Sequence, residues 1–144
     1  MGMRLHLIMI APDQIEAVAR DEERLFTLIE DPQPPTGLDI EKAWHGIHYL
    51  LNGTPFTANG PLGAVILGGQ DIGSDLGYGP PRVLTAPQVR EVSQALMALP
   101  PDHLPKRFDP KAMDSADVYP TVWVREGSAS LEWLQSTLVD LVDF

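Results

Sequence analysis

The chain has 144 residues, the usual size of one folded domain, and its 44% hydrophobic residues exclude a disordered chain. Asp and Glu number 20 against 10 Lys and Arg, which gives a net charge of −10. Nucleic acids and anionic membrane surfaces bind clustered Lys and Arg, so this balance argues against both as partners. Solubility is the simplest explanation of the acidity, and attraction of a basic protein partner is the alternative.

The sequence also limits the possible cysteine chemistry and the cellular location of the protein. The chain has no cysteine, which excludes disulfides, thiolate metal sites and a cysteine nucleophile. Its first residues do not form a signal peptide, and no apolar run approaches the roughly 20 residues that span a bilayer. We therefore expect a cytoplasmic protein with no membrane association.

Hydrophobic spacing and the Pro and Gly breaks predict one α+β domain, compact and mostly helical, with a small sheet over residues 1–144. In the first half we expect a buried strand at 5–10, helices at 12–20, 22–30 and 39–51, and a loop at 31–37. Residues 61–69 fit either a short helix or a buried strand. Asp39 is the expected N-cap of the helix at 39–51, and Ala11 is a poor cap for the helix that Pro12 opens.

The second half begins with an irregular glycine-rich stretch at 70–81 and an extended segment at 82–84. Thr85 is expected to cap a helix whose apolar face carries Val89, Val92, Leu96 and Leu99. One or two short helical turns follow at 103–113, and Asp109 before a proline is a natural cap or turn residue. Residues 118–124 are β-prone although a proline interrupts them. A final helix opens at residue 128 or 130.

The helix expected at 39–51 carries the best candidate functional residues. Its core face is predicted to contain six apolar side chains: Ile40, Ala43, Trp44, Ile47, Leu50 and Leu51. Glu41, His45 and His48 then fall in a narrow stripe beside that face, at spacings of four and three that bring their side chains together. A group placed there would be half desolvated and firmly held.

Three interpretations of this stripe compete. Glu41, His45 and His48 could bind a transition metal with a further ligand from elsewhere, but no HExxH-like signature supports it. A histidine could act as a general acid or base, with Glu41 orienting it. In the favoured interpretation both histidines pack at the helix margin and hydrogen-bond to nearby loops. The sequence therefore implies no metal and no cofactor.

Two other segments contribute candidate ligand-binding residues. The glycine-rich stretch fits neither a dinucleotide fingerprint nor a P-loop, and it either packs Tyr78 against the body or presents it to a ligand. Asp117 and Tyr119 belong to a segment in which several carboxylates lie near aromatic residues. The sequence gives no sign that two of these carboxylates converge, and no nucleophile elbow G-x-S-x-G occurs.

Taken in order, several motifs resemble the YfbM-like family, a bacterial family of domains without an assigned function. They are MGM at 1–3, LDIEKAWHGIHYLL at 38–51, PLG at 61–63, LGG at 67–69, LGYGP at 76–80, FDP at 108–110, DVYP at 117–120 and Trp123. The resemblance implies a compact α+β domain. The resemblance also implies that such proteins continue through more helix to a closing apolar strand, which we expect this chain to lack. Without it the N-terminal strand would keep an open edge, through which copies of the chain could associate.

Two classes of function remain. The charge and the lack of a catalytic signature favour a non-catalytic protein-binding module, for example an immunity-type protein that binds a basic toxin. The alternative is a small enzyme or ligand-binding domain that uses His45, His48, Tyr78 and Asp117 in one cleft. The two classes differ in whether these side chains converge on a concavity.

Overall fold

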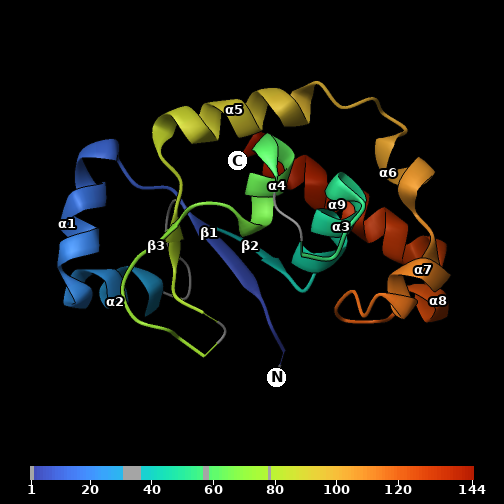
Figure 1. The fold of residues 1–144 in the computed structure, drawn as a ribbon, viewed down its shortest axis with the longest axis horizontal. Coiled ribbons are helices and arrows are strands. Elements are labelled where there is room, and N and C mark those ends of the chain that lie inside the picture. Colours follow the sequence, from blue (N-terminus) through green and yellow to red (C-terminus); the bar gives the residue numbers. More distant parts are fainter. Residues whose placement is uncertain (1, 31–36, 57–58, 78) are drawn as a thin grey trace.

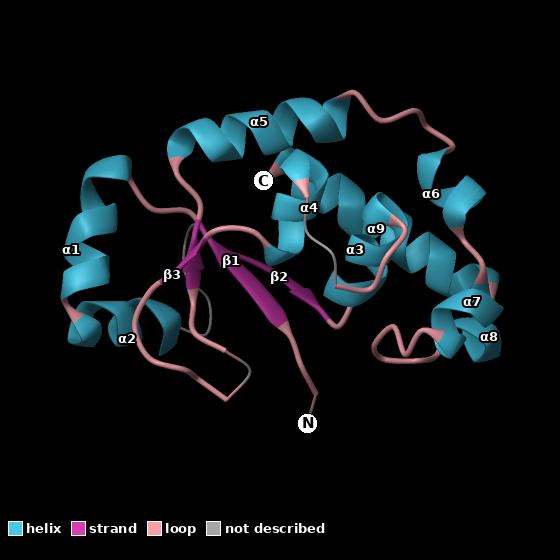
Figure 2. Ribbon diagram, in the orientation of Figure 1, coloured by secondary structure: helices cyan, strands magenta, loops and turns pink. Residues whose placement is uncertain are grey.

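The computed structural model describes residues 2–30, 37–56, 59–77 and 79–144. Helices flank two small antiparallel sheets, as the α+β prediction requires (Figures 1 and 2). In chain order the elements are β1 (Leu5–Ile8), a 3-10 turn (Pro12–Gln14), α1 (Ile15–Arg20), α2 (Glu22–Glu30), β2 (Gly37–Glu41), α3 (Trp44–Asn52), α4 (Gly60–Leu67), β3 (Gln70–Asp71), β4 (Arg82–Val83), α5 (Ala86–Met97), α6 (His103–Arg107), α7 (Pro110–Ser115), α8 (Trp123–Glu126) and α9 (Ser128–Asp143).

The sheet formed by β1 and β2 has one apolar and one charged face. His6 stands opposite Asp39, and Leu7 stands opposite Leu38. Because side chains alternate along a strand, the leucines share the inner face with Leu5, and the histidine lies on the outer face. β1 is shorter than predicted and only partly buried, because in the described chain it pairs with β2 alone.

The prediction of a helix at 39–51 is wrong for its first turn. β2 extends through residue 41, and α3 begins only at Trp44. Asp39 therefore caps no helix; its Oδ1 accepts the Glu41 backbone N–H at 2.8 Å, and its other oxygen pairs with Arg4. Pairing with β1, which is distant in sequence, outweighs a helical pattern that is equally good locally. The later end is correct, since Gly53 ends α3 at a φ of 75°.

The ambiguous run at 61–69 is a helix, α4, and it packs against α3. The extended prediction at 82–84 is confirmed by β4, which pairs with β3. Thr85 caps α5 as expected, and a capping box with Gln88 completes the cap. Val89, however, is 50% exposed rather than buried, because α5 covers the core with only part of its apolar face. Ala11 makes no side-chain cap, as predicted.

The β-prone segment 118–124 is also wrong as a strand. A turn occupies its first part and α8 begins at Trp123. Both carboxylate oxygens of Asp114 accept backbone N–H groups of the new helix, from Trp123 at 3.3 Å and Val124 at 3.1 Å. The Trp123 indole donates to the Val118 carbonyl at 2.7 Å. These hydrogen bonds satisfy backbone groups that a strand would have paired with a neighbouring strand.

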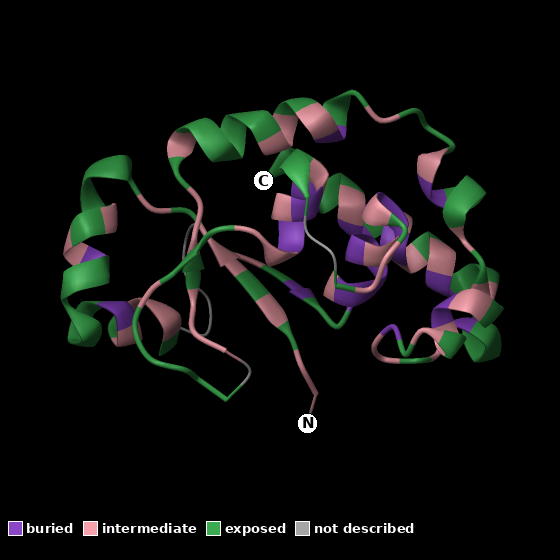
Figure 3. Cartoon of the chain, viewed as in Figure 1, coloured by how far each residue is buried: buried purple, intermediate pink, exposed green. Residues whose placement is uncertain are grey.

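The core lies between α3, α4 and α9, where buried residues concentrate (Figure 3). Ile47, Leu50 and the other predicted core residues of α3 are buried or packed against the core, as expected. Trp123 and Leu134 are fully buried against the same helix. α1 and α5 remain mostly exposed on the periphery (Figure 3).

Candidate functional site

His45 lies at the first turn of α3 and joins two loops. Its Nε2 contacts the Pro55 carbonyl oxygen at 2.9 Å, and its Nδ1 contacts the Tyr119 backbone nitrogen at 2.8 Å. The ring is only 2% exposed. The favoured interpretation, in which the histidine hydrogen-bonds to nearby loops, is confirmed for His45, and these loops also bury its ring.

These two bonds determine the protonation of the His45 ring. The Tyr119 N–H is a donor and the Pro55 carbonyl is an acceptor, so Nδ1 accepts and Nε2 carries the hydrogen of a neutral ring. Burial lowers the pKa of His45 from its ordinary 6.5, and the hydrogen bond to Pro55 opposes this shift. The ring is a neutral bridge between loops with no nitrogen left for acid–base chemistry.

Aromatic side chains around His45 bind the segment that precedes β1. Trp44 stacks on His45 at 4.7 Å between ring centroids and on Tyr119 at 6.0 Å, and Phe56 lies 4.8 Å from His45. The Tyr119 hydroxyl accepts the Met3 backbone N–H at 3.0 Å, and the Trp44 indole donates to the Met3 carbonyl at 3.0 Å. We call these five residues the N-terminal clamp. Tyr119 was a candidate from the sequence, and Met3 stood out only as part of the MGM motif of the family resemblance. Phe56 carried no signal beyond its residue type.

His48 is fully buried one turn along α3. Its Nδ1 lies 3.4 Å from the side-chain nitrogen of Asn52. The same amide donates to the carbonyl oxygen of Leu62, at the start of α4, at 3.1 Å. His48 therefore takes part in the packing of α3 on α4, and its ring is inaccessible to solvent.

The remaining candidates do not join the histidines. Glu41 lies on β2 with its side chain 59% exposed, where its carboxylate pairs with Arg4 at 3.1 Å. Asp117 is exposed in the turn before Tyr119, at a φ of 55°. Tyr78 lies outside the described residues. Across the described ranges, no group of three or more His, Asp or Glu side chains is placed to hold a metal ion.

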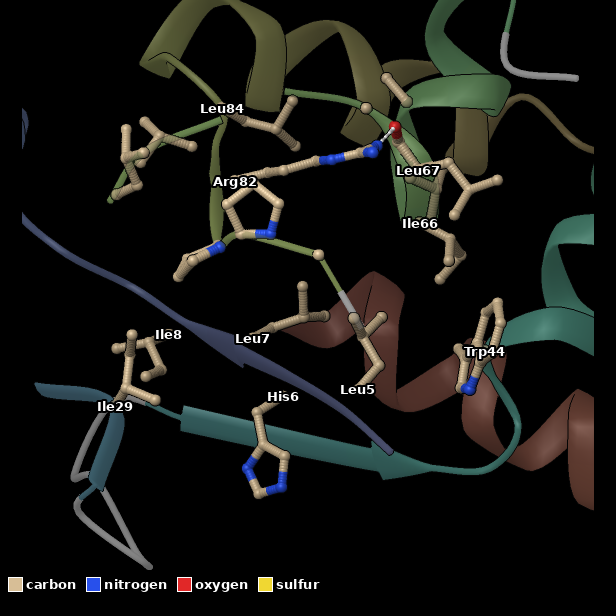
Figure 4. A pocket seen from close by; sticks show the side chains of 18 of the residues that line it. Leu5, His6, Leu7, Ile8, Ile29, Trp44, Ile66, Leu67, Arg82 and Leu84 are labelled. Carbon is tan, nitrogen blue, oxygen red and sulfur yellow. Dashed lines mark hydrogen bonds between the residues drawn. The ribbon is translucent and has the colours of Figure 1, made fainter. Parts of the chain in front are cut away.

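A hollow in the described chain lies elsewhere, over the inner face of β1 (Figure 4). It is a groove of about 770 Å³ bounded by β1, α2, α4 and β4. Leu5 and Leu7 point into it, and the side chains of Ile66 and Leu84 line the opposite side (Figure 4). Of the N-terminal clamp, Met3, Trp44 and Phe56 reach its wall, whereas His45 and Tyr119 do not line it.

Arg82 crosses one side of the groove. Its Nη1 donates to the carbonyl oxygen of Leu67 at the end of α4 (Figure 4), and its Nε donates to Asp71 at 3.1 Å. A guanidinium at a helix C-terminus also matches the negative end of the helix dipole. No sequence pattern singles out Arg82, because only the tertiary structure brings β4 against α4.

The comparisons identify the family. The profile described as "Domain of unknown function (DUF1877)" matches residues 1–144. The chain belongs to this DUF1877 family. No curated protein matches the chain. Among solved structures, the crystal structure of YfbM from Escherichia coli, described as a protein of unknown function, is similar with a TM-score of 0.78. It is 20% identical, and the match covers 98% of this chain and 89% of that chain. The likeness confirms the YfbM-like fold expected from the motifs.

Three of the motifs that carry the family resemblance meet in this structure. The MGM, AWH and DVYP motifs all supply residues of the N-terminal clamp. Gly2 fits only because it has no side chain, since a Cβ there would stand 2.2 Å from the Tyr119 hydroxyl. In this chain the motifs therefore hold the N-terminus against α3. In the described part of the chain, no helix is both long and apolar enough to cross a bilayer.

Proposed function

We propose that this DUF1877 domain is a non-catalytic binding module for a basic protein partner. The observation that carries the proposal is the surface of α9 near its end. There Val139 is 59% exposed and Val142 is 38% exposed, and both alternate with the carboxylates of Asp140 and Asp143. Residues 126–144 contain four acidic residues and no Lys or Arg. We call the surface formed by Val139, Asp140, Val142 and Asp143 the α9 patch.

Apolar and acidic side chains in one stripe suit a basic protein. Residues three apart on a helix are neighbours, so the two valines form one exposed row and the two aspartates form the next. Exposed apolar side chains beside charged ones are typical of protein interfaces. Acidic neighbours attract a cationic partner and raise its association rate, which the net charge of −10 reinforces. An immunity-type protein that neutralises a basic toxin has this character.

The state of the histidines supports a non-catalytic role. Both nitrogens of His45 are engaged with the backbone, and His48 is fully buried. A general base must reach the proton that it removes, and neither ring is placed to reach a substrate. Because the His45 ring is neutral and both of its nitrogens are hydrogen-bonded, it can be buried without a catalytic role.

The test is binding to a purified partner. The partner is found by affinity capture from the source cells, then expressed alone, and its affinity is measured by calorimetry at low and high salt. We expect a basic partner whose affinity falls as salt rises. The double variant Asp140→Asn with Asp143→Asn should weaken binding about tenfold, from two lost ion pairs.

The matched control is the double variant Asp13→Asn, in the 3-10 turn, with Glu16→Gln, in α1, which removes the same charge far from α9 in the sequence. It should change the affinity little. Affinity that is independent of salt, or equal losses from both double variants, would contradict the assignment of the α9 patch. If only acidic or neutral proteins bind, the proposed function fails.

A further inference from the structure

The groove over β1 has the size and walls of a small-molecule site. Its volume of about 770 Å³ lies within the usual range of ligand pockets. Its walls are mainly apolar, with leucine and isoleucine side chains from β1, α2 and α4 facing one another (Figure 4). Such pockets typically add a few placed polar groups to an apolar body.

The charged groups of the groove have the opposite sign to the protein. Acidic residues outnumber Lys and Arg by 20 to 10 in the chain, yet the described lining contains Arg4 and Arg82 and no Asp or Glu. Arg4 is directed to the outer face of the sheet, where it pairs with Asp39 and Glu41. Arg82 is therefore the charge that a molecule inside the groove would meet.

Arg82 has donors to spare. A guanidinium carries five N–H donors. The hydrogen bonds that the described residues make to Arg82 use its Nε and one donor of Nη1. Its partner Asp71 is 61% exposed, so water screens that ion pair. The contact with Leu67 also holds the guanidinium in place, which reduces the entropy lost when it binds a carboxylate.

We propose that this groove binds a single-chain amphiphile with a carboxylate head, of the fatty-acid class. The acyl chain would lie between the inner face of β1 and the walls formed by α2 and α4. The carboxylate would accept from the remaining N–H groups of Arg82. This site is separate from the α9 patch and does not depend on the proposed protein partner.

The test compares three ligands that share one alkyl chain. Decanoate, decanol and decylammonium are titrated into the purified protein by calorimetry, each below its micelle concentration. Decanoate should bind about tenfold more tightly than decanol, as expected of a charge-assisted hydrogen bond, and decylammonium should bind most weakly. Amide chemical shifts should change along β1 and β4. Equal affinities for decanoate and decanol, tighter binding of decylammonium, or no binding of decanoate would overturn the proposal.

Variants then test Arg82 itself. Arg82→Gln should weaken decanoate about tenfold and leave decanol unchanged, because only the head group loses a partner. Arg90→Gln, the same change at an exposed position of α5 outside the groove, should alter neither ligand. If Arg82→Gln weakens both ligands equally, Arg82 serves the fold and the head-group assignment is wrong. If that variant does not fold, the three-ligand series on the unchanged protein remains decisive.

Discussion

The Nδ1 atom of His45 accepts the backbone N–H of Tyr119 at 2.8 Å, across 74 residues of chain. The Nε2 atom donates to the Pro55 carbonyl, so the ring joins α3 to the loop that follows it and to the turn at Tyr119. Buried polar groups stabilise a fold only when each finds its partner. His45 therefore acts as a structural bridge within the N-terminal clamp.

His45→Phe should destabilise the protein although it preserves an aromatic ring. The ring could still pack beside Trp44, but the Tyr119 N–H and the Pro55 carbonyl would lose their partner. Each unsatisfied group costs about 1 to 3 kcal/mol, so we expect the two together to lower the free energy of unfolding by about 2 to 6 kcal/mol, measured by urea unfolding. His6→Phe, on the exposed face of β1, is the control and should change stability by less than about 0.5 kcal/mol. Equal effects would contradict the bridging role.

His45 should also make stability depend on pH. Its pKa in the folded protein is lowered, so the unfolded chain binds the proton more readily. The stability from the neutral ring is then full above the ordinary value of 6.5 and decreases as the pH falls toward the folded pKa. The free energy of unfolding of the wild type should therefore fall between about pH 7.5 and pH 5.5. This decrease should be smaller in His45→Phe; parallel curves for the two proteins would assign it to other groups.

Gly46→Ala should strain the packing of α3. A Cβ at Gly46 would stand 2.5 Å from the Trp123 ring and 3.0 Å from Leu134. Both neighbours are fully buried, so relief requires their movement, and overpacking of this kind costs about 1 to 3 kcal/mol. Thermal unfolding measures the loss. The cost should shrink in a Trp123→Phe background, where the smaller ring leaves room, and an unchanged cost there would refute the clash.

The edge of β1 gives a prediction about assembly. In the described chain β1 has a strand neighbour on one side only, and an open edge can pair with another copy. We expect a concentration-dependent dimer in size-exclusion chromatography with light scattering. Lysine at the edge blocks such pairing, so Ile8→Lys should shift the protein toward monomer. A strict monomer at every concentration would rule out this association.

Much of the fold could be predicted from local pattern. The cap at Thr85 was predictable because its capping-box partner, Gln88, lies three residues away. The stop of α3 at Gly53 is a local signal too. The errors at residues 39–43 and 118–124 have another origin. At 39–41 the backbone pairs with β1, more than 30 residues away, and at 123–124 it donates to the side chain of Asp114.

The candidate site shows the same division. His45 and Tyr119 could be singled out as residue types, and the structure brings them into one cluster. Glu41 could not be excluded, because its separation from the histidines depends on β2 pairing with β1. The groove and Arg82 could not be found at all, because β1 and β4 meet α4 only in three dimensions.

The sequence by itself determined the acidic surface, the α+β class, the apolar face of α3 and the family motifs, because each depends on composition or short-range spacing. The tertiary structure decided that His45 is a buried bridge, that Glu41 belongs to a strand, and that an arginine stands over an apolar groove. The physical reason is that burial, ring protonation and a cavity are set by segments that touch only after the chain has folded.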